Sequence, residues 1–147
     1  MCDNKKFELM HRFVNAEKKF CHLLDEKLNS IGVYSTQMQI LMYISDRKEY
    51  APSQKDISQA FDISPAAVAV SLRKLEKAGL VLKNVFDKDN RVNNVSLTDK
   101  GNEKVELIKR EISDIADNLF SDNSENEVIV LENLLSKLQK IITDYKN

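Results

Sequence analysis

The sequence of 147 residues contains little of what interrupts helices or staples small folds, with three glycines, two prolines, two cysteines and no tryptophan. So few turn-forming residues exclude the many short strands of a sandwich or barrel and favour long helices. Two cysteines cannot build the disulfide framework of a small secreted protein, so we expect Cys2 and Cys21 to be free thiols. No apolar run approaches the ~20 residues of a membrane span, and the first residues lead into a charged helix rather than the apolar core of a secretion signal. We therefore expect a cytoplasmic protein with no membrane partner.

The charges are nearly balanced overall but unevenly distributed along the chain. The net charge is −1 and the isoelectric point is near 6.1, whereas a basic nucleic-acid-binding domain typically has a value above ~9. Residues 51–100 nevertheless carry eight basic and six acidic side chains, and residues 101–147 carry six and ten. An anionic partner is therefore expected to bind the middle of the chain.

The hydrophobic pattern predicts a mostly α-helical fold with one small β-hairpin. Apolar residues recur at three- and four-residue steps before residue 79 and after residue 98, which indicates amphipathic helices, and two short β-prone runs lie between them. The expected elements are a helix over residues 5–28, a helix started by a capping box at Thr36 and Gln39, a short helix capped by Ser53, a helix capped by Ser64 and ended by Gly79, strands over 80–86 and 92–97, and two helices capped by Thr98 and Ser124.

The block over residues 53–97 carries the functional signal. A short helix, a tight turn and a second capped helix form a helix-turn-helix, whose second helix has the diameter that fits the ~12 Å major groove of B-DNA. The β-hairpin that follows adds a wing. The terminal helices carry more apolar surface than so small a central lobe can cover, and pairing with a second copy would bury it.

Several motifs of this block resemble those of one known family. They are Asp62–Ile63–Ser64–Pro65–Ala66–Ala67–Val68, Leu72–Arg73–Lys74–Leu75–Glu76–Lys77–Ala78–Gly79–Leu80, Asp89–Asn90–Arg91 and Leu97–Thr98–Asp99–Lys100–Gly101. Together they resemble the winged helix-turn-helix of MarR-family transcription regulators, and the Asp-x-Arg of the wing followed by Leu-Thr-x-Lys-Gly is the most specific part. The resemblance implies a homodimer on a palindromic operator in double-stranded DNA. It divides the chain into an N-terminal dimerisation helix (residues 1–34), a winged lobe (35–98) and C-terminal dimerisation helices (99–147).

The candidate DNA-binding residues fall into three groups. Those facing the major groove are on the fourth helix or cap it: Ser64, Ala66, Ala67, Ala69, Val70 and Arg73. Those expected at phosphates are Ser53, Gln54, Ser71, Lys74 and Lys77. In the wing they are Lys88, Asp89, Asn90, Arg91 and Asn93; the resemblance places Arg91 in the minor groove, oriented by Asp89.

These residues also have plainer interpretations. Helix capping by itself explains Ser53, Ser64 and Thr98. Lys74 and Lys77 fit an ordinary solvated helix face. Asp89 and Arg91 fit a surface ion pair of ~0–1 kcal/mol.

The resemblance further implies a small aromatic effector bound between the dimer helices and the winged lobe. The residues that would line its site are Met10, His11, Phe13, Met42, Tyr43 and Phe86, although apolar residues at helical spacing also fit a plain core. Cys21 does not match the position of the sensing cysteine in peroxide-responsive relatives, which falls near Phe7 or Met10, so we expect a buried, inert thiol.

Metal and cofactor chemistry finds little support. His11 and His22 lie eleven residues apart on one helix, about 16 Å, too far to share a metal within one chain. We expect no cofactor and no enzymatic activity, because the sequence has no glycine-rich phosphate loop, nucleophile elbow or plausible triad. The sequence therefore favours a dimeric transcription regulator, and a repressor in particular, released by a small ligand. The alternatives are a winged-helix protein-interaction module without DNA binding and a thiol-based redox sensor of the same fold.

Overall fold

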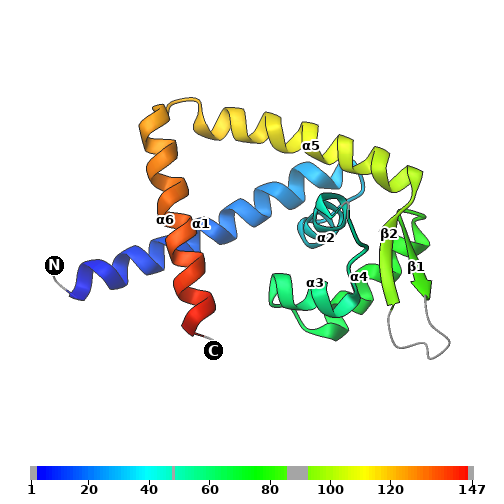
Figure 1. Cartoon of the computed structure of the whole chain (residues 1–147). Helices are drawn as coiled ribbons and strands as arrows, with labels where there is room; N and C mark the ends of the chain where they lie inside the picture. Colours follow the sequence, from blue (N-terminus) through cyan, green and yellow to red (C-terminus); the bar gives the residue numbers. More distant parts are fainter. Residues whose placement is uncertain (1–2, 48, 86–92, 146–147) are drawn as a thin grey trace. The chain divides into compact units, whose positions relative to one another are not determined.

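The computed structural model describes residues 3–47, 49–85 and 93–145, and within them the fold is mostly helical with one antiparallel hairpin (Figure 1). The elements are α1 (Asp3–Asn29), α2 (Ser35–Asp46), α3 (Gln54–Phe61), α4 (Pro65–Lys77), β1 (Val81–Val85), β2 (Asn93–Leu97), α5 (Asp99–Phe120) and α6 (Glu125–Tyr145). This confirms the predicted fold class and the order of the elements. Two compact units cover residues 1–111 and 112–147, and each is described by itself.

The start of α2 differs from the prediction. The capping box expected at Thr36 and Gln39 is wrong, because the helix begins at Ser35 and Gln37 accepts the hydrogen bond from the Tyr34 amide at 3.1 Å. The Ser35 amide donates to Asp25 Oδ1 of α1 at 2.6 Å. A carboxylate from another helix therefore satisfies one of the free amides at this end.

The core of the first unit gathers around α2, which packs against α1, α4 and β2. Figure 1 shows α3, α4 and the hairpin grouped on one side of α2. Fully buried side chains come from the first four helices, from both strands and from the first half of α5. They include Leu28, Ile40, Leu41, Ile57, Leu72, Leu75, Val81, Val95, Val105 and Ile108. This core holds α4 against β1 and leaves its opposite face outward.

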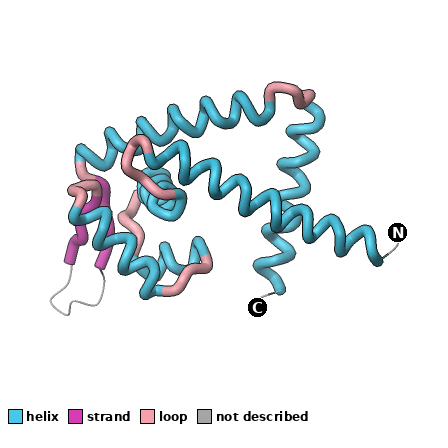
Figure 2. Tube along the Cα trace, turned by 180° about the vertical axis from the view of Figure 1, so that it is seen from behind, coloured by secondary structure: helices cyan, strands magenta, loops and turns pink. Residues whose placement is uncertain are grey.

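The two strands of the hairpin lie side by side and form the wing (Figure 2). Val81 pairs with Leu97 and Lys83 with Val95, and the inward side chains of Val81 and Val95 are buried whereas Leu82 is 53% exposed. The amide of Val95 also donates to the Pro52 carbonyl at 2.8 Å. The chain that enters α3 is thereby tied to the wing.

The second unit contains the end of α5 and all of α6. Ser124 caps α6, donating from its amide and hydroxyl to Glu127 at 2.8 and 2.9 Å, and these bonds lower the pKa of the Glu127 carboxyl. Every residue from 117 to 145 is exposed. The exposed apolar side chains of α6 are Val128, Ile129, Val130, Leu131, Leu134, Leu135, Leu138, Ile141, Ile142 and Tyr145. No helix among the described residues is both long and apolar enough to cross a membrane.

Candidate nucleic-acid interface

Helix α4 is closed at both ends by the residues that the sequence analysis identified. The Ser64 hydroxyl accepts a hydrogen bond from the Ala67 amide at 3.2 Å, and Pro65 occupies the first helical position, where no amide bond is needed. At the other end Gly79 has a φ of +72°, and the amides of Gly79 and Leu80 each donate at 2.9 Å to carbonyls of the last turn. This pair of bonds is the Schellman arrangement that ends a helix at a left-handed glycine.

One face of α4 is buried and the other is exposed. Val68, Leu72 and Leu75 form the inward stripe, with 0, 0 and 1% of their surface exposed. The residues of the outer face are exposed, apart from half-buried Ala69: they are Ser64, Ala66, Ala67, Ala69, Val70 and Arg73. The structure thus leaves this outer face of α4 open, and contact of these residues with DNA stays a prediction.

Helix α3 holds the start of α4 in place. Gln54 Nε2 donates to the Pro65 carbonyl at 3.1 Å, which links the first turns of the two helices. In the turn between them, the Ser58 hydroxyl donates to the Ile63 carbonyl at 2.6 Å, and Asp62 takes up a left-handed conformation with a φ of 54°. These bonds make the helix-turn-helix corner rigid.

Ser53 caps α3 in a reciprocal capping box with Asp56. The amide and hydroxyl of Ser53 both donate to Asp56 Oδ2 at 2.8 Å, and the Asp56 amide donates to the Ser53 hydroxyl at 3.1 Å. These hydrogen bonds, from the Ser53 amide first, hold the pKa of the Asp56 carboxyl below its ordinary value because they favour the charged form. The caps at Ser53 and Ser64 are therefore present, and contact of the same side chains with DNA stays a prediction.

Two lysines lie in the last turn of α4. Lys74 and Lys77 are exposed, and Ser71 is half-buried. Beside Lys74 the start of α2 and the outer side of α4 line an open hollow of about 430 Å³, with Tyr34, Ala67, Val70 and Lys74 among its lining residues. Tyr34, which lies one residue before α2 and is 57% exposed, was not among the residues predicted from the sequence.

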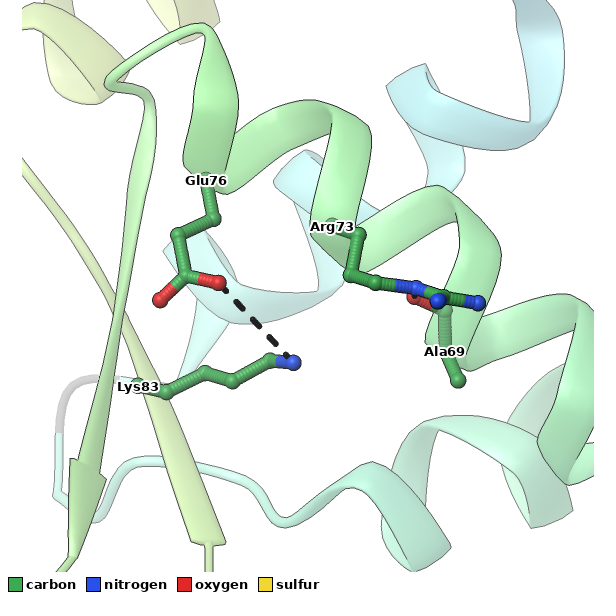
Figure 3. Close-up of polar contacts among 4 residues, drawn as sticks. All are labelled: Ala69, Arg73, Glu76 and Lys83. Carbon is green, nitrogen blue, oxygen red and sulfur yellow. Dashed lines mark hydrogen bonds and ion pairs between the residues drawn. The ribbon is translucent and has the colours of Figure 1, made fainter.

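The tip of the wing lies outside the described residues. This applies to Phe86, Lys88, Asp89, Asn90 and Arg91, and for Asn93 the structure gives only its strand pairing with Val85. At the base of the wing, Lys83 of β1 lies 3.9 Å from the Glu76 carboxylate of α4 (Figure 3). The wing and α4 are therefore linked by an ion pair as well as by apolar packing.

The Leu-Thr-x-Lys-Gly motif joins the end of α4 to the start of α5. Thr98 donates from its hydroxyl to the Gly79 carbonyl at 2.6 Å and from its amide to the Leu80 carbonyl at 3.1 Å, and Lys100 Nζ donates to the Ala78 carbonyl at 2.8 Å. The Thr98 hydroxyl also accepts from the Gly101 amide at 2.9 Å and caps α5, as predicted. The role of Lys100 was missed, because only the fold brings it within reach of Ala78.

The expected effector-site residues occupy two different settings. Met10, His11 and Phe13 are exposed on α1, whereas Met42 and Tyr43 are half-buried on α2. Tyr43 packs edge-on against Phe61 with ring centroids 5.4 Å apart, and the Arg47 guanidinium lies 3.4 Å from the centre of its ring. Tyr43 therefore has a packing role in the lobe, and an effector role for any of these residues stays a prediction.

The expectation of a buried thiol at Cys21 is wrong. The residue is half-buried, because its helix turn lies near the edge of the lobe, and Sγ donates to Glu17 Oε1 at 3.2 Å. This hydrogen bond to Glu17, together with burial and the nearby carboxylates, raises the pKa of the Cys21 thiol. A raised pKa lowers the fraction of reactive thiolate. Within residues 3–47, 49–85 and 93–145, no group of three or more histidine, cysteine or acidic side chains is placed to hold a metal ion.

Comparison with known proteins supports the same fold. A family model described as the MarR family matches residues 31–91. The chain is 29% identical over 122 residues to the HTH-type transcriptional repressor MdtR of Bacillus subtilis. The matched region covers 82% of this chain and 77% of MdtR.

Two solved structures extend the likeness over nearly the whole chain. The transcriptional regulator BldR from Sulfolobus solfataricus has a TM-score of 0.82 at 23% identity, covering 98% of this chain and 99% of that chain. The DNA complex of MepR from S. aureus has a TM-score of 0.80 at 25% identity, covering 89% and 96%. The winged helix-turn-helix fold, with its order of helices and strands, is thus shared with these proteins.

Proposed function

We propose that the chain is a winged helix-turn-helix transcription regulator of the MarR family, whose model matches residues 31–91, and that it binds a palindromic operator as a homodimer and represses transcription. The observation that carries this proposal is α4, a helix capped at both ends whose outer face is exposed from Ser64 to Arg73 while its inner face is locked in the core. A rigid helix with a free face is what a helix-turn-helix inserts into the major groove.

The outer face of α4 determines how DNA would be contacted. Its side chains at Ala66, Ala67, Ala69 and Val70 present methyl groups, which contact the C5-methyl of thymine. Small side chains also allow the helix backbone to approach the bases closely. We therefore place Ser64, Ala66, Ala67, Ala69, Val70 and Arg73 in the major groove.

Phosphate contacts would fix the position of the lobe on the duplex. Ser53 and Gln54 lie at the first turn of α3, where backbone amides favour an anion, and Lys74 and Lys77 lie at the end of α4. Ser71 lies one turn before Lys74. Such contacts carry no sequence information but make binding strongly dependent on salt.

The wing would reach the neighbouring minor groove. The structure describes its two strands, β1 and β2, and the tip residues lie outside the described part of the chain. By family resemblance, Arg91 enters the minor groove with Asp89 beside it, and Lys88, Asn90 and Asn93 contact the backbone. A narrow A·T-rich groove attracts such an arginine through its enhanced negative potential.

The exposed apolar side chains of α1 and α6 support the homodimer. Phe7, Leu9 and Met10 on α1 are 71, 66 and 70% exposed, and on α6 Leu134 and Ile142 are 52 and 54% exposed. Apolar side chains left exposed along a helix in this number mark a protein–protein contact. Twofold symmetry would then place the two α4 helices about one turn of DNA apart, ~34 Å, and match a palindromic site.

Repression is the simplest consequence of such binding, because a dimer that occupies a promoter needs no contact with polymerase. MdtR, one of the similar proteins, is itself named a transcriptional repressor. A small aromatic effector would release the dimer from DNA by favouring a different placement of the lobes. The residues proposed to bind it are Met10, His11, Phe13, Met42, Tyr43 and Phe86.

The proposal is tested by DNA affinity measured against salt. Binding to an A·T-rich palindrome from the protein's own promoter should fall steeply between about 50 and 200 mM salt, with a slope of about −0.9 for each phosphate neutralised. The double variant Arg91→Ala with Lys74→Ala should weaken binding and flatten the slope. Lys137→Ala with Lys140→Ala, on exposed positions of α6, is the matched control and should change neither.

The same experiment distinguishes a winged-helix protein-interaction module. A folded dimer that forms no salt-sensitive complex with any duplex at low salt would contradict the regulator proposal. Repeating the measurement with phenolic compounds and with peroxide then separates effector release from thiol sensing.

A further inference from the structure

We propose that Arg73 reads a guanine in each half of the operator and supplies the base-specific hydrogen bonds of α4. The proposal deepens the proposed function, on which it rests, by naming the base that the helix recognises. The outer face of α4 offers few groups that can form hydrogen bonds to bases. Ala66, Ala67, Ala69 and Val70 have no polar side-chain atom, so Arg73 is the residue of the middle of the helix that can donate two hydrogen bonds in one plane.

The side chain of Arg73 is directed toward the half of α4 that enters the groove. Its Nε donates to the Ala69 carbonyl at 3.3 Å, one helical turn earlier (Figure 3). Because one turn is about 5.4 Å, this bond moves the guanidinium toward the N-terminal part of the helix, where a recognition helix contacts base edges. The small side chain of Ala69 leaves room for the guanidinium to lie along the helix.

The remaining donors of Arg73 match one base. With Nε bonded to the helix, the two terminal nitrogens still present N–H groups side by side. Guanine offers its O6 and N7 acceptors side by side in the major groove, and arginine is the side chain that pairs with both. Adenine presents a donor beside its N7 and would leave one arginine N–H unpaired.

The wing keeps a competing carboxylate turned away from Arg73. Glu76 lies three residues further along α4, at a spacing where an acid and a base on one helix commonly pair. Its carboxylate instead lies 3.9 Å from Lys83 Nζ on β1, and Figure 3 shows it directed toward the strand while Arg73 extends the opposite way. Lys83 therefore acts as a positioning residue for Arg73.

The expected operator follows from this arrangement. Each half-site should contain one guanine that contacts Arg73, next to thymines whose methyl groups meet the alanines and Val70. The experiment is a selection of binding duplexes from a randomised library at low salt, followed by sequencing. It compares the wild-type protein with the variants Arg73→Ala, Arg73→Lys and Lys77→Ala, each checked for wild-type helical content and unfolding temperature.

The wild-type protein should enrich a guanine at one position of each half-site. Arg73→Ala should reduce the preference for guanine there by about 5- to 150-fold, the discrimination that a good bidentate pair supplies, and leave the preferences at other positions unchanged. Arg73→Lys should keep more of the affinity but not the preference, because lysine is a point charge without the planar fork. Lys77→Ala should weaken binding to all sequences equally.

The role of Lys83 has its own test. Lys83→Met frees Glu76 to pair with Arg73 and should lower the guanine preference, and adding Glu76→Gln in the same protein should restore it. A guanine preference unaffected by Lys83→Met would refute this positioning role.

Three results would overturn the reading of guanine by Arg73. If Arg73→Ala weakens binding to all duplexes equally, the side chain contacts phosphate. If the wild-type protein enriches sites without a shared guanine, the inference is wrong while the proposed function stands. If no duplex is enriched at low salt, both are wrong.

Discussion

Gly101, in the first turn of α5, lies against the backbone of Leu80, which follows the end of α4. A methyl group at this position would overlap the carbonyl oxygen of Leu80 and press on the Leu97 side chain. The backbone of Leu80 cannot move away, because its carbonyl is bonded to the Thr98 amide and its amide to the Leu75 carbonyl. The glycine of the Leu-Thr-x-Lys-Gly motif is therefore explained by packing between backbones.

We predict that Gly101→Ala destabilises the protein by about 1–3 kcal/mol, the usual cost of overpacking. Helix propensity alone predicts the opposite sign, since alanine is favoured over glycine in a helix by about 0.5–1 kcal/mol. Urea unfolding followed by circular dichroism measures the difference. Glu103→Ala, exposed in the same part of α5, is the control and should change the free energy of unfolding by less than about 0.5 kcal/mol. A stabilised Gly101→Ala would contradict the packing explanation.

At the scale of elements, the important feature is that the turn after α4 is bonded to the start of α5. Thr98, which caps α5, and Lys100 donate to the carbonyls of Ala78, Gly79 and Leu80, the three residues between the end of α4 and β1. Because α4 is held at its start by Gln54 of α3 and at its end by α5, its outer face is presented in one orientation. Rigid support of this kind is what a recognition element needs.

We predict that Thr98→Val costs about 1–3 kcal/mol of stability, because half-buried Thr98 loses its hydrogen bond to the Gly79 carbonyl and the cap on the Gly101 amide. Thr36→Val makes the same chemical change at an exposed residue in the first turn of α2, where Gln37 provides the cap, and should be nearly neutral. Thermal and urea unfolding of the two variants provide the measurement. An equal change in the free energy of unfolding for both variants would show that the hydrogen bonds of Thr98 add no stability.

At the scale of the whole molecule, the apolar side chains of α6 form a surface that the chain itself leaves exposed. Leu131, Leu135, Leu138 and Ile142 recur at three- and four-residue steps, so they lie along one side of the helix, and each is 38–54% exposed. Burying such a stripe against a second copy would give the dimer most of its stability through the hydrophobic effect. The dimer that we propose for DNA binding would then also be the stable form of the protein.

We predict that the wild-type chain sediments as a dimer at micromolar concentration and that Leu138→Asp is monomeric or unfolded, because a carboxylate would be buried without a partner. Lys140→Asp introduces the same side chain on the polar side of α6 and should remain a dimer. Sedimentation velocity and circular dichroism measure both properties. A monomeric wild-type protein would refute the dimer and with it the spacing of the two α4 helices.

Short-range features could be predicted well from the sequence. The caps at Ser53, Ser64, Thr98 and Ser124 each join groups three residues apart, and Gly79 ends α4 through bonds within its own last turn. The stripe of Val68, Leu72 and Leu75 was visible in the spacing alone. The outer face of α4, and with it most of the major-groove candidates, followed from that stripe.

Long-range partners could not be predicted in the same way. The start of α2 was misplaced because Asp25, ten residues away, satisfies the Ser35 amide, and Gln37 replaces the expected cap at Thr36. The exposure of Cys21 depended on where the lobe ends along α1.

The amino-acid sequence by itself determined the helices, the wing and which face of α4 points outward, because helix caps and hydrophobic periodicity act between residues a few positions apart. The tertiary structure decided that Lys100 donates to the Ala78 carbonyl just after α4 and that Lys83 lies 3.9 Å from the Glu76 carboxylate. These contacts exist only once distant segments have packed together, since burial of the core, and not local preference, brings their atoms within hydrogen-bonding distance.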